Sequence, residues 1–170
     1  MADLAPWHDF AILIGTAFAT LIGLLFVSAS VGAGVFNPER QYALRVFLSQ
    51  SVVHFSAGLA IALIVVAPLP SAHIVGTLVL ATALFGAAYA GVTGWRMVHH
   101  HLIETLDLAD RLWYGIIPAI AYLVMIAAGV TLFRGLDAGV PLLAATLVQL
   151  LIAGIRNAWD ITTWVILRQP

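Results

Sequence analysis

An uninterrupted apolar run near the N-terminus decides the fold. Residues 10–27 read FAILIGTAFATLIGLLFV and include no charged side chain. A helix rises about 1.5 Å per residue, so about 20 apolar residues cross the roughly 30 Å hydrocarbon core of a bilayer. Small and apolar residues continue the run to about position 35. The stretch from about residue 10 to 35 therefore predicts a first membrane-spanning helix.

Four more apolar stretches of similar length follow. They cover about residues 46–67, 72–95, 112–133 and 140–167. We see no soluble domain between them and no convincing internal repeat. The sequence therefore predicts an all-α, polytopic membrane protein, in which residues 1–170 form a single domain built as a bundle of five transmembrane helices.

The connections between these stretches contain helix-start signals. Asp9 is a candidate N-cap of the first helix, Pro38 suits the first position of the second, and Ser71 is placed to cap the third. Between the third and fourth spans, the apolar residues of segment 97–111 recur at helical spacing, and its polar residues share the opposite face. We interpret this segment as an amphipathic cytoplasmic connector.

The composition excludes several classes of protein. Of the 170 residues, 62% are apolar and 9% are charged, whereas soluble domains have roughly 25% charged residues. The net charge of −1 and the absence of a basic patch indicate no nucleic-acid partner, and the lipid bilayer is the expected surrounding. Without cysteine the chain has no disulfide or thiolate nucleophile. Without lysine it cannot hold retinal through a Schiff base, and no cofactor is predicted.

The arginines predict the orientation. Arg40 and Arg45 lie between the first and second spans, Arg96 and Arg111 between the third and fourth, and Arg168 follows the fifth. These five fall on one side of the membrane, and Arg134 stands alone on the other side. Positive residues concentrate on the cytoplasmic side of a membrane. We therefore expect the N-terminus outside and the C-terminus in the cytoplasm.

Two opposite charges lie within the last span. Arg156 and Asp160 are four residues apart, the separation at which helical side chains meet. A charge in the membrane costs about 2.5–3.5 kcal/mol on insertion scales, so such residues are candidates for function. The alternative is a structural clamp, or an interfacial pair whose side chains extend to the headgroups.

Other polar residues of the spans come out at related depths. At a helical rise of about 1.5 Å per residue, His54 is expected to lie roughly 12–15 Å below the cytoplasmic edge of the membrane. Tyr122 and Arg156 are expected at a similar depth. The predicted intramembrane polar cluster comprises Gln50, His54, Tyr122, Gln149, Arg156, Asn157 and Asp160. A histidine in such a cluster can relay protons or gate a pathway. The alternative is a neutral core histidine with one hydrogen-bond partner.

Some histidines of the sequence are candidates for binding a metal ion or haem. His8 and Asp9 stand with His73 at the outer ends of their spans, and imidazoles with a carboxylate suit zinc or copper. A membrane haem usually needs two histidines at matching depth. His54 has no histidine partner at its depth, whereas His8 and His73 match each other. The alternative is ordinary interfacial polarity. Successive residues point about 100° apart on a helix, so the three histidines at 99–101 cannot all face one ion. Only His100, Glu104 and Asp107 share a face, which we interpret as a solvated helix face.

Small residues recur every four positions in two spans. They are Gly15, Ala19 and Gly23 in the first, and Gly86, Ala90 and Gly94 in the third. Such spacing lets helix backbones approach closely in a membrane. These residues are predicted helix-packing positions, either within one chain or between subunits.

Two stretches carry a resemblance. Residues 7–10 read WHDF and lead into GTAFATLIGLLFV at 15–27, and residues 156–160 read RNAWD. Together they resemble a group of small bacterial integral membrane proteins that share this opening and a similar late Arg-Asn-Ala-Trp-Asp run. The resemblance implies a multi-pass protein of the bacterial inner membrane. It implies no activity, because none is established for the group.

Three functions are compatible with the sequence. The first is a small oligomeric channel or transporter, with the polar cluster in the cytoplasmic half of the membrane. The second is a non-catalytic accessory or scaffold subunit of a membrane complex. The third, a redox protein linked to haem or quinone, is poorly supported by the histidine pattern. No hydrolase motif is present. The transport hypothesis predicts that water reaches the polar cluster, and the scaffold hypothesis predicts that protein seals it.

Overall fold

The computed structural model describes residues 4–32, 38–99 and 111–167, and in these ranges the chain is all-helical. A short 3-10 turn, η1 (Ala5–Trp7), precedes the first helix, and a π-helical turn, η3 (Leu112–Ile116), leads directly into α5. The long helices are α1 (His8–Gly32), α2 (Pro38–Val66), α3 (Ala72–His99), α5 (Ile117–Phe133) and α6 (Gly139–Leu167). The predicted all-α class is therefore confirmed. Most of the predicted connector, residues 100–110, lies outside the described residues.

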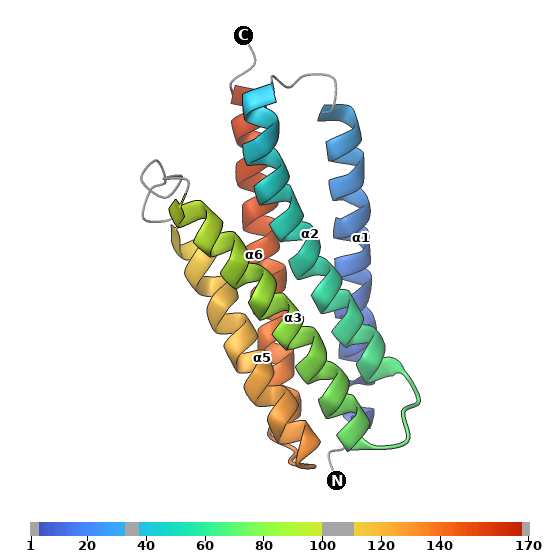
Figure 1. Cartoon of the computed structure of the whole chain (residues 1–170). Coiled ribbons are helices and arrows are strands. Elements are labelled where there is room, and N and C mark those ends of the chain that lie inside the picture. Colours follow the sequence, from blue (N-terminus) through green and yellow to red (C-terminus); the bar gives the residue numbers. More distant parts are fainter. Residues whose placement is uncertain (1–3, 33–37, 100–110, 168–170) are drawn as a thin grey trace.

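The helices form a bundle of alternating direction (Figure 1). α3 packs along α5, α1 packs along α2, and α6 contacts both α2 and α5. We call the end at which α6 finishes, at the top of Figure 1, the upper end; α2 begins there and α1 finishes there. α6 thus joins the α1–α2 pair to the α3–α5 pair, and its side chains lie where functional residues from several helices can meet.

The helix starts follow from local chemistry. α2 begins at Pro38, as expected, because the first helical position needs no backbone N–H. The Ser71 hydroxyl oxygen accepts a hydrogen bond from the Ile74 N–H at 3.4 Å, as expected of an N-cap. Asp9 is not an N-cap: α1 already begins at His8, so Asp9 lies in the first turn. A carboxylate there still interacts favourably with the helix dipole.

The turn between α5 and α6 is closed by a glycine. Gly135 has φ of +74°, a conformation that residues with a side chain rarely adopt. The Leu136 N–H bonds to the Thr131 carbonyl at 2.9 Å, and the Gly135 N–H to the Leu132 carbonyl at 2.8 Å. This pair of bonds is the Schellman motif, which satisfies the last carbonyls of α5.

The outside of the bundle is apolar. Leu13, Phe85 and Leu123 are among the most exposed large side chains. In water such a surface would be unstable, whereas lipid accepts it. Within the described residues, five helices are long and apolar enough to cross a membrane. The fold is that of a multi-pass membrane protein.

Inside the bundle, aromatic rings are packed on glycines. Phe18 lies against Gly58, Phe55 against Gly154 and Tyr122 against Gly86, so closely that a β-carbon on any of these glycines would overlap the ring. Each ring is fully buried. Because lipid is as apolar as a side chain, such close packing, rather than the hydrophobic effect, holds membrane helices together.

The predicted small-residue stripes are used only in part. Gly15 faces Ala62, and Gly86 faces Tyr122. Ala90 is partly buried against the core, but Ala19 is exposed. Nothing lies within 4 Å of a β-carbon built on Gly23 or Gly94, so neither makes a close contact with the described part of the chain. A period of four drifts around a helix of 3.6 residues per turn, so the ends of each stripe leave the packed face.

Candidate functional site

The centre of the site is a break in the hydrogen bonding at the start of α5. Pro118 has no N–H, so it cannot bond to the carbonyl four residues earlier, that of Tyr114. The preceding turn is π-helical: the Ile117 N–H reaches the carbonyl of Leu112 instead. The Tyr114 carbonyl therefore lacks its usual helical donor. In an apolar bundle such a carbonyl requires a donor from elsewhere.

Two glutamines from other helices donate to this segment. The Gln50 amide nitrogen, on α2, hydrogen-bonds the Tyr114 carbonyl. The Gln149 amide nitrogen, on α6, donates to the Ile117 carbonyl at 3.0 Å. Both glutamines were predicted members of the polar cluster. Their contacts show that they fix α2 and α6 to the irregular start of α5.

His54 and Tyr122 form the second contact of the site. The His54 Nδ1 and the Tyr122 hydroxyl are 2.8 Å apart, and both side chains are fully buried. The rings lie 5.5 Å apart between centroids. Gly86 of α3 supports the other side of the tyrosine ring. The predicted pairing in depth of His54 and Tyr122 thus corresponds to a direct hydrogen bond, which lies one turn of α2 from Gln50.

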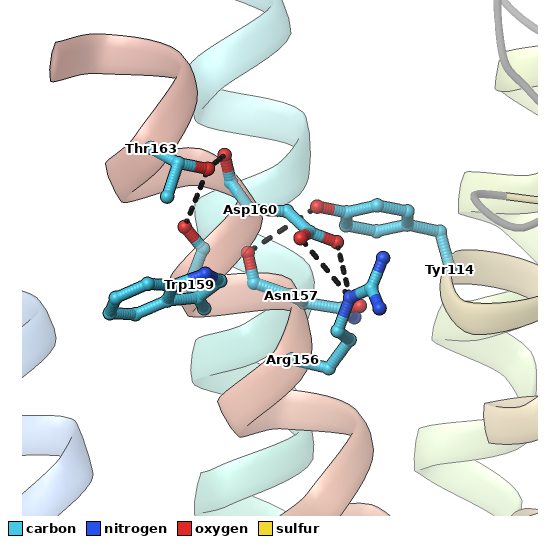
Figure 2. A network of polar contacts seen from close by, with 6 residues as sticks. All are labelled: Tyr114, Arg156, Asn157, Trp159, Asp160 and Thr163. Atoms are coloured by element: carbon cyan, nitrogen blue, oxygen red, sulfur yellow. Dashed lines mark hydrogen bonds and ion pairs between the residues drawn. The ribbon is translucent and has the colours of Figure 1, made fainter. Parts of the chain in front are cut away.

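The charged pair, Arg156 and Asp160, lies at the upper part of the site. The Arg156 Nε donates to both Asp160 carboxylate oxygens, at 3.1 and 2.9 Å, and Figure 2 shows the two side chains facing each other on α6. The guanidinium carbon lies 5.7 Å from the centre of the Trp113 ring, within the range of a cation–π contact. The two side chains are 41% and 26% exposed, so this pair is not sealed inside the bundle.

The rest of the network in Figure 2 links α6 to η3 and to itself. The Tyr114 hydroxyl donates to the Asn157 backbone carbonyl at 3.3 Å. Thr163 donates to the carbonyls of Trp159 and Asp160, at 3.1 and 3.0 Å. Tyr114 therefore joins two parts of the site: its carbonyl binds Gln50 of α2, and its hydroxyl binds the backbone of α6.

Three buried side chains of the site have polar atoms without a hydrogen-bond partner among the residues that the structure describes. These atoms are Gln50 Oε1, His54 Nε2, and both Nδ2 and Oδ1 of Asn157. Each side chain is at most 2% exposed. A buried polar group without a partner costs about 1–3 kcal/mol, and buried polar atoms in native proteins are nearly always satisfied by protein, water or ligand. These four buried atoms are therefore candidates for hydrogen bonds to water or to another bound molecule.

The predicted metal site does not assemble. His73 bonds through Nδ1 to the Phe133 carbonyl of α5, and this contact turns its ring toward α5. The His8 Nδ1 instead lies 3.7 Å from the Oδ1 of Asp9, its neighbour in the sequence. Among the residues that the structure describes, no group of three or more His, Cys, Asp or Glu side chains could hold a metal ion. His101 and the side chain of His99 lie outside the described residues.

Sequence reasoning missed the role of Tyr114. Its signal was present: Pro118 stands four residues later and cannot supply the usual helical donor to the Tyr114 carbonyl. Trp113 was missed as the partner of Arg156, because a tryptophan at the end of a span is ordinarily an interfacial anchor. Both residues lie in η3, and the exceptional hydrogen bonding of that turn positions them.

Fold and site together define a class: a helical membrane-spanning bundle with a buried polar junction. We use the name polar junction for Gln50, His54, Tyr114, Tyr122 and Asn157. Comparison of the chain with protein-family models, with curated proteins and with solved structures found no match. The function is therefore argued from the polar junction itself.

Proposed function

We propose that the chain is a small membrane transport protein, a channel or transporter, and that its solute passes through the polar junction. The observation that carries this proposal is the set of four buried polar atoms without a partner. They lie among helices whose other buried side chains are nearly all apolar. Packing alone does not explain why these polar side chains are buried. A solute that supplies the missing hydrogen bonds would explain it.

Asn157 supports the proposal most directly. Neither polar atom of its side chain has a partner, although the side chain is fully buried. A leucine, which has the same number of side-chain heavy atoms, would avoid the cost of burying an unsatisfied amide, which is about 1–3 kcal/mol. Asparagine is therefore unfavourable for stability at this position. Residues that lower stability without a structural return are typical of functional sites.

The setting of this transporter is part of the same proposal. The resemblance of the opening and late stretches favours the bacterial inner membrane, and five arginines against one favour a cytoplasmic upper end. Large side chains such as Phe18, Phe55 and Met125 are fully buried in the core, which favours a narrow pathway over a wide pore. We therefore propose a narrow pathway along the junction in each subunit of a homo-oligomer.

Flux through purified protein in liposomes tests this function. We expect the wild-type protein to pass at least one of five probes (protons, potassium, chloride, urea and glycerol) faster than empty liposomes. Asn157→Leu is expected to abolish that flux and to leave the melting temperature equal or higher, because it removes an unsatisfied amide and no hydrogen bond made by its side chain. Fluorescent ion indicators and light scattering after an osmotic jump measure the two kinds of flux.

A matched control lies two residues away. Ile155→Leu changes a side chain on the exposed face of α6 and is expected to leave flux unchanged. If no probe passes through the wild-type protein, the transport function is contradicted. A large fall in the melting temperature of Asn157→Leu would instead assign the asparagine a structural role.

An accessory role is the second candidate, and two observations favour it. Protein buries Gln50, His54, Tyr122 and Asn157 almost completely, as the scaffold hypothesis predicts. Arg156 and Asp160 are partly exposed, and Trp159 between them is 66% exposed. Aromatic and arginine side chains are common at the centres of protein interfaces. A scaffold predicts that purified protein passes no solute and that Arg156→Ala weakens its association with other membrane proteins. The flux assay above separates the two candidates.

A further inference from the structure

The polar junction presents hydrogen-bonding groups in a fixed arrangement. The partner of Gln50 is a backbone carbonyl, which can only accept, so the nitrogen of the Gln50 amide must face Tyr114. The Gln50 oxygen is therefore left as an acceptor that needs a donor. Asn157 offers both an acceptor oxygen and a donor nitrogen, whichever way its amide is turned.

The contacts of Phe55 and Tyr114 connect the helices that carry these groups. Gln50 and His54 are one turn apart on the same face of α2. Phe55, next to His54, packs on Gly154 of α6, and Asn157 follows Gly154 by three residues on the same face. Tyr114 connects both sides, because its carbonyl binds Gln50 and its hydroxyl binds the backbone of Asn157.

The groups presented at the junction are uncharged amide, imidazole and phenol side chains. Arg156 adjoins Asn157 in the sequence, but its guanidinium pairs with the Asp160 carboxylate, so the two add no net charge. A bare cation could not accept a hydrogen bond from the Asn157 nitrogen, and a halide could not donate one to Gln50. The molecule that satisfies all these atoms both donates and accepts.

We propose that the solute of the polar junction is a small uncharged molecule that both donates and accepts hydrogen bonds, with Gln50, His54 and Asn157 as its binding groups. This inference rests on the proposed transport function and names the class of its solute. Amides and polyols belong to this class. Burial of an ion among these neutral groups would leave its charge without a counter-charge, which is costly in a membrane.

Paired flux measurements on the intact protein test the class of solute. Proteoliposomes are exposed to inward gradients of urea and of glycerol, and their swelling is followed by light scattering. Potassium, chloride and proton entry are followed in the same preparation. We expect a several-fold faster uptake of urea or glycerol than in empty liposomes, a return to the empty-liposome rate in Asn157→Leu, and ion entry equal to that of empty liposomes throughout.

Each other result overturns a separate statement. Entry of ions without urea or glycerol would contradict the neutral solute and leave the transport function standing. No entry of any probe would contradict both. Uptake of urea or glycerol that is equal in Asn157→Leu and wild type, with both variants folded by melting temperature, would contradict the binding role of Asn157.

Discussion

Gly86→Ala is expected to destabilise the bundle strongly and to disrupt the polar junction. A β-carbon at this position overlaps the Tyr122 ring, which is fully buried. Overpacking of this kind costs about 1–3 kcal/mol. If the ring moves away from His54, the histidine loses its only described hydrogen bond, at a further cost of about 1–3 kcal/mol.

Thermal unfolding in detergent micelles measures this effect. Gly94→Ala is the matched control: it lies two turns further along α3, and nothing is within 4 Å of its added carbon. Tyr122→Phe separates the two contributions, because it removes the hydroxyl and keeps the ring. We expect melting temperatures in the order wild type equal to Gly94→Ala, then Tyr122→Phe, then Gly86→Ala. Equal melting of Gly86→Ala and Gly94→Ala would contradict the packing of Tyr122 on α3.

Gly76→Ala is expected to have the second large effect, at the lower end of the bundle. Its β-carbon would overlap the backbone nitrogen of Phe133, and the Gly129 carbonyl lies 2.9 Å away. A side chain can change rotamer to relieve a clash, but a backbone cannot. α3 and α5 must therefore move apart, and we expect a loss of about 3 kcal/mol, at the upper end of the range for overpacking.

Gly91→Ala is the control for this substitution, since its added carbon also meets nothing within 4 Å. The free energy of unfolding, from titration with a denaturing detergent, is expected to fall for Gly76→Ala and to stay unchanged for Gly91→Ala. Because Gly76 is remote from η3, the irregular start of α5 should keep its contacts with Gln50. A Gly76→Ala protein as stable as wild type would show that α3 and α5 are not in backbone contact there.

Much of the fold could be predicted because membrane spans are encoded locally. A run such as residues 10–27 needs no knowledge of its neighbours to be assigned as a helix, since an isolated backbone in lipid must satisfy its own hydrogen bonds. Pro38 and Ser71 marked helix starts for similarly local reasons. What the stripes of small residues could not reveal was which face each helix turns inward, because this depends on partners far away in the sequence. Gly154 and Gly58, which hold the rings of Phe55 and Phe18, stood in neither stripe.

The sequence predicted most residues of the candidate site, but it predicted few of the hydrogen bonds between them. Counting depth along the helices brought His54 and Tyr122 together, and the structure joins them by a hydrogen bond. Gln50 was expected beside His54, but its role in satisfying the Tyr114 carbonyl required the π-helical turn before Pro118. The prominent charges of Arg156 and Asp160 drew attention to the pair, whereas the unsatisfied atoms belong to the neutral Asn157 beside them. Charge is visible in a sequence; an unmet hydrogen bond is visible only in a structure.

Transport through the buried polar junction requires that water and small polar molecules reach it, and the chain allows a direct measurement because it has no cysteine. Asn157→Cys and Ala121→Cys each introduce a single thiol, the first at the junction and the second in the fully buried apolar core. Both proteins are treated in liposomes with iodoacetamide, a small uncharged amide, and the added mass is followed by intact mass spectrometry. Alkylation requires the thiolate, which forms only where water reaches the sulfur. We predict that Asn157→Cys is alkylated many times faster than Ala121→Cys; equal and negligible alkylation of the two would contradict a hydrated junction.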